Sequence, residues 1–212
     1  MSDDRRATPP FYERYWATQK DGKPSDFVHK WPALQPLIPR EPGLIILDYG
    51  CGNGEILREL RGINSGARYI GVDVSETALA TARAVLPEAT FHQVSDGDRV
   101  PVSAASVDFI FSSEVIEHVY DTEVVFAEFA RLLRQSGRVL ITTPYHGLIK
   151  NLLIVTFAFD RHFNPRGAHV RFFSKRSLFG CLREVGLEPE KHGYYGRFYP
   201  ISMGIYVLAR KV

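Results

Sequence analysis

This chain of 212 residues has little of several features that mark specialised classes of protein. It contains only two cysteines, Cys51 and Cys181, too few for the disulfide framework of a small secreted domain. No apolar stretch reaches the roughly 18 residues of a membrane-spanning helix, and residues 1–10 lack the apolar region of a secretory signal. We therefore expect a protein of the reducing cytoplasm.

The chain also lacks an excess of charge of either sign. Its 26 lysines and arginines nearly balance its 24 aspartates and glutamates, which gives a formal net charge of +2. No run of basic residues marks a nucleic-acid footprint, so the composition favours a small-molecule partner. With 45% hydrophobic residues the chain can bury one sizeable core, and we expect a single domain over residues 1–212.

Strand and helix signals alternate along most of the chain. Residues 1–10 are expected to be disordered, and residues 11–40 to form a helical cap with short helices at 11–18 and 27–37. The predicted strands are 44–48, 68–72, 89–94, 107–112, 137–143, 187–194 and 202–209, and the predicted helices are about 54–61, 76–85, 121–135 and 174–185. This alternation predicts a mostly parallel α/β sheet covered by helices on both faces. The last two strands have no helix between them and are expected to form an antiparallel pair.

The first predicted strand ends in a turn rich in glycine. An apolar run reaches Asp48 and is followed by Gly50, Gly52 and Gly54. Glycine suits a turn whose backbone must approach a ligand, because it tolerates positive φ and has no Cβ. A dinucleotide fingerprint requires glycine at the first, third and sixth positions of its turn, but the sixth position here is Glu55. A turn without any ligand is the alternative interpretation.

The second predicted strand also ends in an acid, Asp73, followed by Val74. Ligands of open α/β sheets bind outside the carboxyl ends of the strands, where a carboxylate can accept both hydroxyls of a ribose. Asp73 is the candidate for that role, and Val74 for contact with an adenine face. An acid after a strand is by itself more typical of a helix N-cap, so this interpretation depends on the neighbouring glycine turn.

Four segments together resemble the class I S-adenosylmethionine (SAM) methyltransferases. They are D-Y-G-C-G-N-G at 48–54, G-V-D-V-S at 71–75, D-G-D-R-V-P at 96–101 and S-S-E-V-I-E-H-V at 112–119. Over roughly residues 27–212 the chain is most similar to the ubiquinone-biosynthesis O-methyltransferases. The resemblance implies a Rossmann-like seven-stranded sheet, SAM as cofactor, and transfer of its methyl group to a small molecule, most simply to a hydroxyl oxygen. No N-P-P-Y-type sequence follows the fourth predicted strand, which argues against methylation of a base nitrogen.

The resemblance also implies a set of cofactor contacts. Lys30 would bind the cofactor carboxylate and Asp48 would lie near its ammonium, while Asp96 would take the adenine amino group. The full set of expected cofactor-binding residues is Lys30, Asp48, Gly50, Cys51, Gly52, Asp73, Val74, Asp96 and Ser113. The turn at 132–138 departs from the family pattern, since Gln135 and Ser136 replace a proline and a glycine.

Carboxylates and imidazoles suggest a second centre. Glu114, Glu117 and His118 are spaced so that they would share one face of a helix, and with His169 they resemble the divalent-metal set of small-RNA 2′-O-methyltransferases. A metal there would bind vicinal hydroxyls and lower the pKa of the one to be methylated. The alternative is that Glu117 orients the loop and His118 acts as a plain general base. His118 is the first candidate for that base, and His146 is the second.

Residues 145–170 form a long insertion that the alternation does not require. Its apolar part, residues 147–159, is interpreted as a lid over an apolar acceptor, with contact to a membrane surface or burial in the core as alternatives. Aromatic side chains expected to wall the acceptor pocket are Tyr12, Tyr15, Trp16, Tyr145, Phe172 and Tyr195. The sequence leaves open the acceptor and the oligomeric state, and two other functions: an NAD(P)-dependent oxidoreductase and a non-catalytic SAM-binding module.

Overall fold

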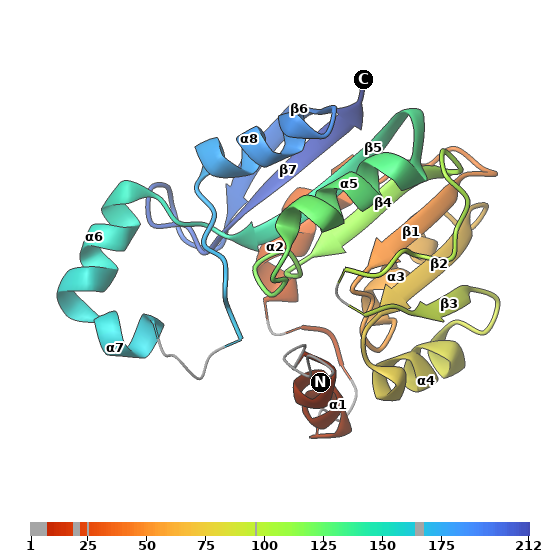
Figure 1. Ribbon diagram of the computed structural model, residues 1–212, viewed down its shortest axis with the longest axis horizontal. Coiled ribbons are helices and arrows are strands. Elements are labelled where there is room, and N and C mark those ends of the chain that lie inside the picture. Colours follow the sequence, from red (N-terminus) through yellow and green to blue (C-terminus); the bar gives the residue numbers. More distant parts are fainter. Residues whose placement is uncertain (1–7, 19–21, 25, 96, 164–167) are drawn as a thin grey trace, which may run out of the picture.

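The computed structural model describes residues 8–18, 22–24, 26–95, 97–163 and 168–212. A seven-stranded sheet has the order β3-β2-β1-β4-β5-β7-β6 (Figure 1). Its strands are β1 (Ile45–Tyr49), β2 (Arg68–Asp73), β3 (Thr90–Gln93), β4 (Val107–Ser113), β5 (Leu133–Pro144), β6 (Leu187–Tyr195) and β7 (Gly204–Lys211). The first five run parallel, whereas β7 pairs antiparallel with both β5 and β6. The predicted fold, including the antiparallel C-terminal pair, is therefore confirmed.

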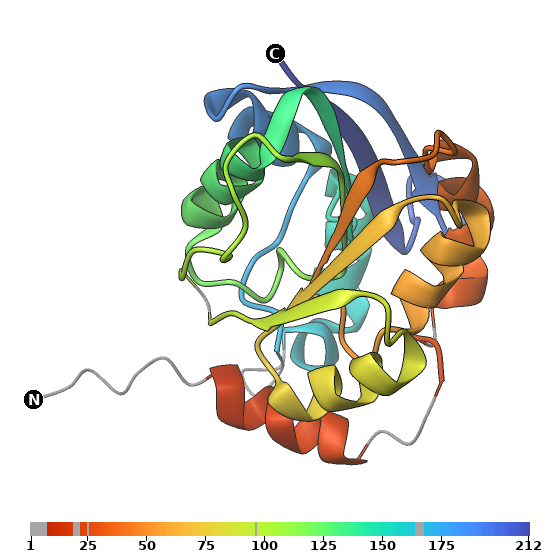
Figure 2. The same cartoon turned by 90° about the vertical axis from the view of Figure 1, so that its right-hand side faces the viewer.

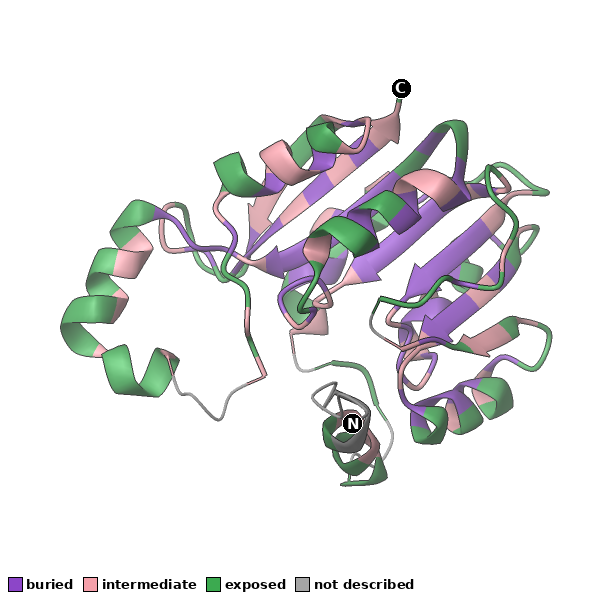
Figure 3. Cartoon of the chain, in the orientation of Figure 1, coloured by how far each residue is buried: buried purple, intermediate pink, exposed green. Residues whose placement is uncertain are grey.

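Alternation of side chains across the sheet builds two cores. On β1, Ile46 and Leu47 are both fully buried but belong to different hydrophobic clusters, because successive side chains of a strand point to opposite faces. One cluster contains residues of α5 (Thr122–Leu132) and α8 (Lys175–Glu184), and the other contains residues of α2 (Phe27–Leu34) and α3 (Glu55–Ile63). Figure 3 shows the central strands buried between these layers.

Local sequence sets where several helices begin. Ser75 accepts a hydrogen bond from Ala78 N at the start of α4 (Glu76–Val85), and Asp121 accepts one from Val124 N at the start of α5. Ser174 forms a capping box at the start of α8. Short polar side chains at these positions satisfy backbone donors that a helix leaves free in its first turn.

One helix boundary differs from the prediction. The helix expected over 121–135 ends at Leu132, and β5 begins at Leu133. Leu133 has extended backbone angles, is fully buried and pairs with Val107 of β4. Burial in the sheet thus overrides the helical pattern, and Ser136 takes a positive φ of 63° where the strand then turns.

The N-terminal helices pack in two different places. Helix α1 (Thr8–Thr18) packs beside α4 (Figure 2), whereas α2, which is followed by the short 3-10 helix η1 (Gln35–Leu37), contributes Trp31 and Leu34 to the core on one face of the sheet. Residues 1–10 were expected to be disordered. Of these, residues 1–7 lie outside the described residues, whereas residues 8–10 form the first turn of α1.

The insertion contains α6 (Leu148–Phe157) and α7 (Phe159–His162), which stand away from the sheet (Figure 1). None of their residues is buried, so the interpretation of this segment as core is wrong. Among the described residues, no helix is long and apolar enough to cross a membrane.

Candidate active site

A cavity of about 720 Å³ lies at the carboxyl ends of β1, β2 and β4. Its walls come from α1, the glycine turn, the turn after β4, the segment at 168–169 and the end of β6. The structure brings eight of the expected cofactor residues to this cavity: Lys30, Asp48, Gly50, Cys51, Gly52, Asp73, Val74 and Ser113. The ninth, Asp96, lies outside the described residues.

The glycine turn is shaped by positive φ angles and by close neighbours. Gly50 has a φ of 80°, and a Cβ there would collide with Val115. Gly52 has a φ of 51°, and its Cβ would collide with the ring of Trp16 from α1. Both positions therefore require glycine for space as well as for conformation.

Asp73 ties this turn to the next one. One carboxylate oxygen accepts the Gly52 N–H at 2.8 Å, and the other accepts the Ser75 N–H at 3.0 Å. Burial raises the pKa of Asp73, while these backbone hydrogen bonds oppose the rise. A carboxylate has about four acceptor positions, so Asp73 retains capacity for the hydroxyls of a ribose.

Asp48 carries the clearest sign of a missing cationic partner. It is 2% exposed, and its Oδ2 atom has no hydrogen-bond partner among the described residues. Burial, together with the charge of Asp73, raises the pKa of Asp48 to about 8, whereas Lys30 lowers it. A buried carboxylate oxygen without a donor is costly unless a ligand supplies one, and the ammonium group of SAM fits this position.

Lys30 supplies a positive charge to the same cavity. Its side chain is almost fully buried, and its Nζ atom forms an ion pair of 2.9 Å with Asp26. The four-residue spacing on α2 brings this pair together, and the sequence analysis did not identify Asp26. The location of Lys30 is compatible with its expected contact to a cofactor carboxylate.

The turn after β4 differs from the helix that the spacing suggested. Residues 116–118 form a turn, and Glu114 has a positive φ of 57°, so the acids do not share a helical face. The Glu114 carboxylate instead accepts hydrogen bonds from Thr142 at 2.8 Å and from Tyr195 at 2.5 Å. Glu114 thus belongs to a separate network at the edge of the cavity.

Glu117, His118 and His169 do come together. One ligand atom from each lies within 4.8 Å of the others. The His118 Nδ1–H donates to the Ala168 carbonyl at 3.0 Å, which leaves Nε2 as an acceptor 3.7 Å from Glu117 Oε1. That carboxylate oxygen is buried and has no hydrogen-bond partner among the described residues, while Oε2 accepts from Thr143 at 3.1 Å.

Burial shifts the pKa values in this group in opposite directions, upward for the carboxyl and downward for the imidazoles. It raises the pKa of Glu117 well above its ordinary value, an effect that the charge of Glu114 increases, and it lowers the pKa of His118. Burial and the neighbouring His118 also lower the pKa of His169. Two neutral imidazoles beside a carboxylate form a donor set that divalent transition metals prefer. The backbone hydrogen bond of His118 is typical of a metal-ligating histidine.

His146 lies elsewhere. Its Nδ1 atom is 3.1 Å from Asn151 Oδ1, and its ring packs against His162 and Phe172. Burial lowers the pKa of His146 to about 4. Because His146 does not line the cavity described above, the structure does not bring the second candidate base to the first.

The aromatic side chains divide in the same way. Tyr12, Tyr15, Trp16 and Tyr195 line the cavity, whereas Tyr145 and Phe172 do not. Tyr12 packs against His118 with ring centroids 6.0 Å apart, and its burial raises its pKa. Of the four expected aromatic side chains that line the cavity, three therefore come from α1.

Comparisons with known proteins agree with this geometry. A family model described as a methyltransferase domain matches residues 7–192. The chain is 32% identical to a ubiquinone biosynthesis O-methyltransferase of Thiobacillus denitrificans over 84% of this chain and 79% of that protein. It is 31% identical to the protein of the same name in Aromatoleum aromaticum, over 82% and 77% of the two chains.

A solved structure shares the fold. The geranyl diphosphate C-methyltransferase of Streptomyces coelicolor, solved with Mg²⁺, geranyl diphosphate and S-adenosyl-L-homocysteine, superimposes with a TM-score of 0.70. The alignment covers 97% of this chain and 100% of that one at 16% identity. At this identity the likeness concerns the fold alone.

Proposed function

The chain belongs to the class I SAM-dependent methyltransferases, in the group of the ubiquinone-biosynthesis O-methyltransferases, and we propose from this premise that it methylates a hydroxyl oxygen of a small molecule. The cofactor part of the proposal is carried by the buried Asp48 Oδ2, which has no hydrogen-bond partner among the described residues, in a cavity that also holds the glycine turn and Asp73. The hydroxyl acceptor is supported by the names of the two relatives. Membership of this family favours methyl transfer over hydride transfer, the reaction of the NAD(P)-dependent oxidoreductase that the sequence had left open.

SAM, when bound, supplies an activated methyl group on a sulfonium. The chain itself therefore has to bind the two reactants, align them and exclude water from between them. We assign Asp48 and Lys30, which line the cavity, to the charged ends of the methionine part, and Asp73 to the ribose hydroxyls. Tyr12, Tyr15 and Trp16 form an aromatic wall on the α1 side of the cavity, which would exclude water from the reactants.

A hydroxyl acceptor must also lose its proton, and His118 is our choice of base. Its Nδ1–H is held by Ala168, which fixes the tautomer with a free Nε2 toward the Glu117 side of the cavity. Because burial lowers its pKa, His118 is neutral and able to accept a proton at neutral pH. A positioned base of this kind contributes roughly 10²- to 10⁴-fold to the rate.

As the alternative to a base at His118, we propose a divalent metal at Glu117, His118 and His169, which would occupy the Nε2 atom that the base would use. The buried, unpartnered Oε1 of Glu117 and the free Nε2 of His118 fit such an ion. Bound there, a metal would lower the pKa of an acceptor hydroxyl. Glu114, included in the sequence expectation, is occupied by Thr142 and Tyr195 and is not part of this set.

We propose further that the acceptor is apolar and that α6 is its lid. Leu148, Leu152 and Phe157 are 77%, 58% and 80% exposed, an unusual density of solvated apolar side chains for one helix. No residue of α6 lines the cavity, so this conformation corresponds to an open lid. Contact of α6 with a membrane surface is the competing outcome, which vesicle binding separates from lid closure.

The test combines binding with product analysis. Calorimetry should show binding of SAM and S-adenosylhomocysteine and none of NAD. Incubation with methyl-labelled SAM and a panel of phenols, catechols and prenylated phenols should then give a labelled methyl ether. Binding of SAM with label found only on nitrogen or carbon would overturn O-methylation and leave the methyltransferase assignment intact.

A further inference from the structure

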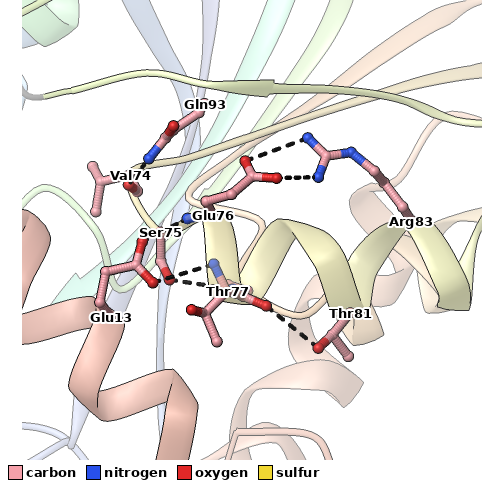
Figure 4. A network of polar contacts seen from close by, with 9 residues as sticks. Glu13, Val74, Ser75, Glu76, Thr77, Thr81, Arg83 and Gln93 are labelled. Carbon is pink, nitrogen blue, oxygen red and sulfur yellow. Dashed lines mark hydrogen bonds and ion pairs between the residues drawn. The ribbon is translucent and has the colours of Figure 1, made fainter.

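The side chain of Glu13 connects helix α1 to the start of α4, beside the cavity. Glu13 accepts a hydrogen bond from the Glu76 N–H at 2.7 Å and a second from the Thr77 N–H at 3.2 Å (Figure 4). These donors belong to the first turn of α4, whose next N–H, that of Ala78, is capped by Ser75. A residue 63 positions away in sequence thus completes the cap of this helix.

The capped turn is also the turn that faces the cofactor. Asp73 and Val74, which line the cavity, precede Ser75, the N-cap of α4, and Asp73 accepts the N–H of Ser75. A carboxylate at a helix N-terminus is stabilised by the free N–H groups and by the helix dipole. In agreement, hydrogen bonds led by that of Thr77 keep the pKa of Glu13 below its ordinary value.

The neighbours of Glu13 on α1 extend over both ends of the cavity. Trp16 lies against Gly52, in the glycine turn, while Tyr12 packs against His118 beside the metal-ligand group. Tyr12 and Trp16 are four residues apart and therefore share one face of α1. The attachment of α1 through Glu13 consequently sets how both residues close the site.

We propose that Glu13 is a positioning residue that latches α1 across the cavity, so that Trp16 and Tyr12 retain the cofactor and complete the acceptor wall. The latch must open for SAM to enter and for the demethylated cofactor to leave. This inference rests on the proposed cofactor site, but the latch itself is a contact between α1 and α4 that can be measured without any ligand.

The experiment compares Glu13→Ala and Glu13→Gln with the wild type and with a matched control, Glu88→Gln. Glu88 is also a partly exposed glutamate, but it pairs with Arg61 beside the amino ends of the strands, away from the cavity. Two readouts are used: the dissociation rate of S-adenosylhomocysteine by stopped flow, and acrylamide quenching of tryptophan fluorescence. The chain has two tryptophans, and Trp31 is buried, so quenching reports mainly on Trp16.

We expect S-adenosylhomocysteine to dissociate roughly fivefold faster from Glu13→Ala, the factor that corresponds to loss of a typical N-cap. Quenching of Trp16 should rise in the same variant, with Glu13→Gln intermediate and Glu88→Gln unchanged. A purely structural role would lower the melting temperature without changing either readout. Wild-type quenching in folded Glu13→Ala overturns the latch, whereas failure of the wild type to bind SAM overturns only the cofactor site.

Discussion

Tyr195 donates a hydrogen bond of 2.5 Å to Glu114 and so connects the end of β6 to the turn after β4. Thr142 of β5 donates to the same carboxylate oxygen, and its Oγ1 lies 2.9 Å from Ser113 Oγ. The antiparallel strand pair is therefore part of the site wall as well as the edge of the sheet. The network holds Glu114 in its left-handed conformation, which directs the turn carrying Glu117 and His118.

We expect Tyr195→Phe to destabilise the protein by about 1–2 kcal/mol, because it removes a donor from a partly buried carboxylate. SAM affinity should change little, while kcat should fall as the turn after β4 loosens. Urea unfolding and steady-state kinetics on Tyr195→Phe, Glu114→Gln and the double variant form a mutant cycle. Strictly additive effects on unfolding would show that the two side chains are not coupled.

Asp48→Asn should weaken SAM binding roughly 10- to 100-fold, since a charge-assisted hydrogen bond is worth about 1.5–3 kcal/mol. The fold should survive, because the substitution replaces a buried carboxylate without a partner on one oxygen by a neutral group of similar size. Calorimetry with SAM measures the loss, and Asp160→Asn on the exposed α7 is the control. Unchanged affinity in a folded variant would remove Asp48 from the cofactor site.

The same residue predicts a pH dependence. The pKa of Asp48 is raised from 3.8 to about 8 by burial and by the charge of Asp73, so the carboxyl is protonated at neutral pH in the ligand-free protein. A bound ammonium favours the ionised form, so SAM binding should release a proton, and affinity should rise between pH 6 and 8. Stability should run the other way, falling as pH rises toward 8, because the unfolded state ionises first. Both slopes should flatten in Asp48→Asn.

The parts of the site that sequence could identify are local. The glycine turn, Asp73 and the succession of strands along the chain follow from patterns of a few residues, and a parallel sheet gathers its strand ends at one edge. Lys30 was nominated by the resemblance, because related enzymes place a basic residue before the first strand. These residues do share the cavity.

The features of the site that could not be predicted from the sequence depend on contacts between segments that are distant along the chain. Glu13 reaches α4, and Tyr195 reaches Glu114, from positions 63 and 81 residues away, with no local pattern that signals either pair. The spacing of Glu114, Glu117 and His118 suggested a helix, but the positive φ of Glu114 produces a turn that separates Glu114 from the other two. His146 was nominated by its place in the insertion, and packing on Phe172 places it outside the cavity.

A metal at Glu117, His118 and His169 predicts that activity disappears on chelation and returns with one of Mg²⁺, Mn²⁺ or Zn²⁺. His118→Asn and His169→Asn should each lose bound metal by elemental analysis, whereas His192→Asn on the exposed part of β6 should keep it. SAM affinity should stay within about twofold throughout, because Asp48 and Asp73 are unchanged. Full activity in metal-free protein would leave His118 as a simple base.

The exposed apolar face of α6 gives the last prediction. Replacing Leu152, Ile154 and Phe157 together by serine should change the unfolding free energy by no more than about 0.5 kcal/mol per substitution, or about 1.5 kcal/mol in total, because none of the three is buried. SAM affinity should also be unchanged, since α6 does not line the cavity. The KM for an apolar acceptor should rise severalfold in detergent-free solution if the helix closes as a lid. If instead only binding to anionic lipid vesicles is lost, with the KM for a soluble acceptor unaffected, α6 is a membrane contact and the lid hypothesis is wrong. Lys150, the basic residue of α6, donates to the Tyr145 and Met203 carbonyls and should be kept in the triple variant, so that the start of the helix stays attached.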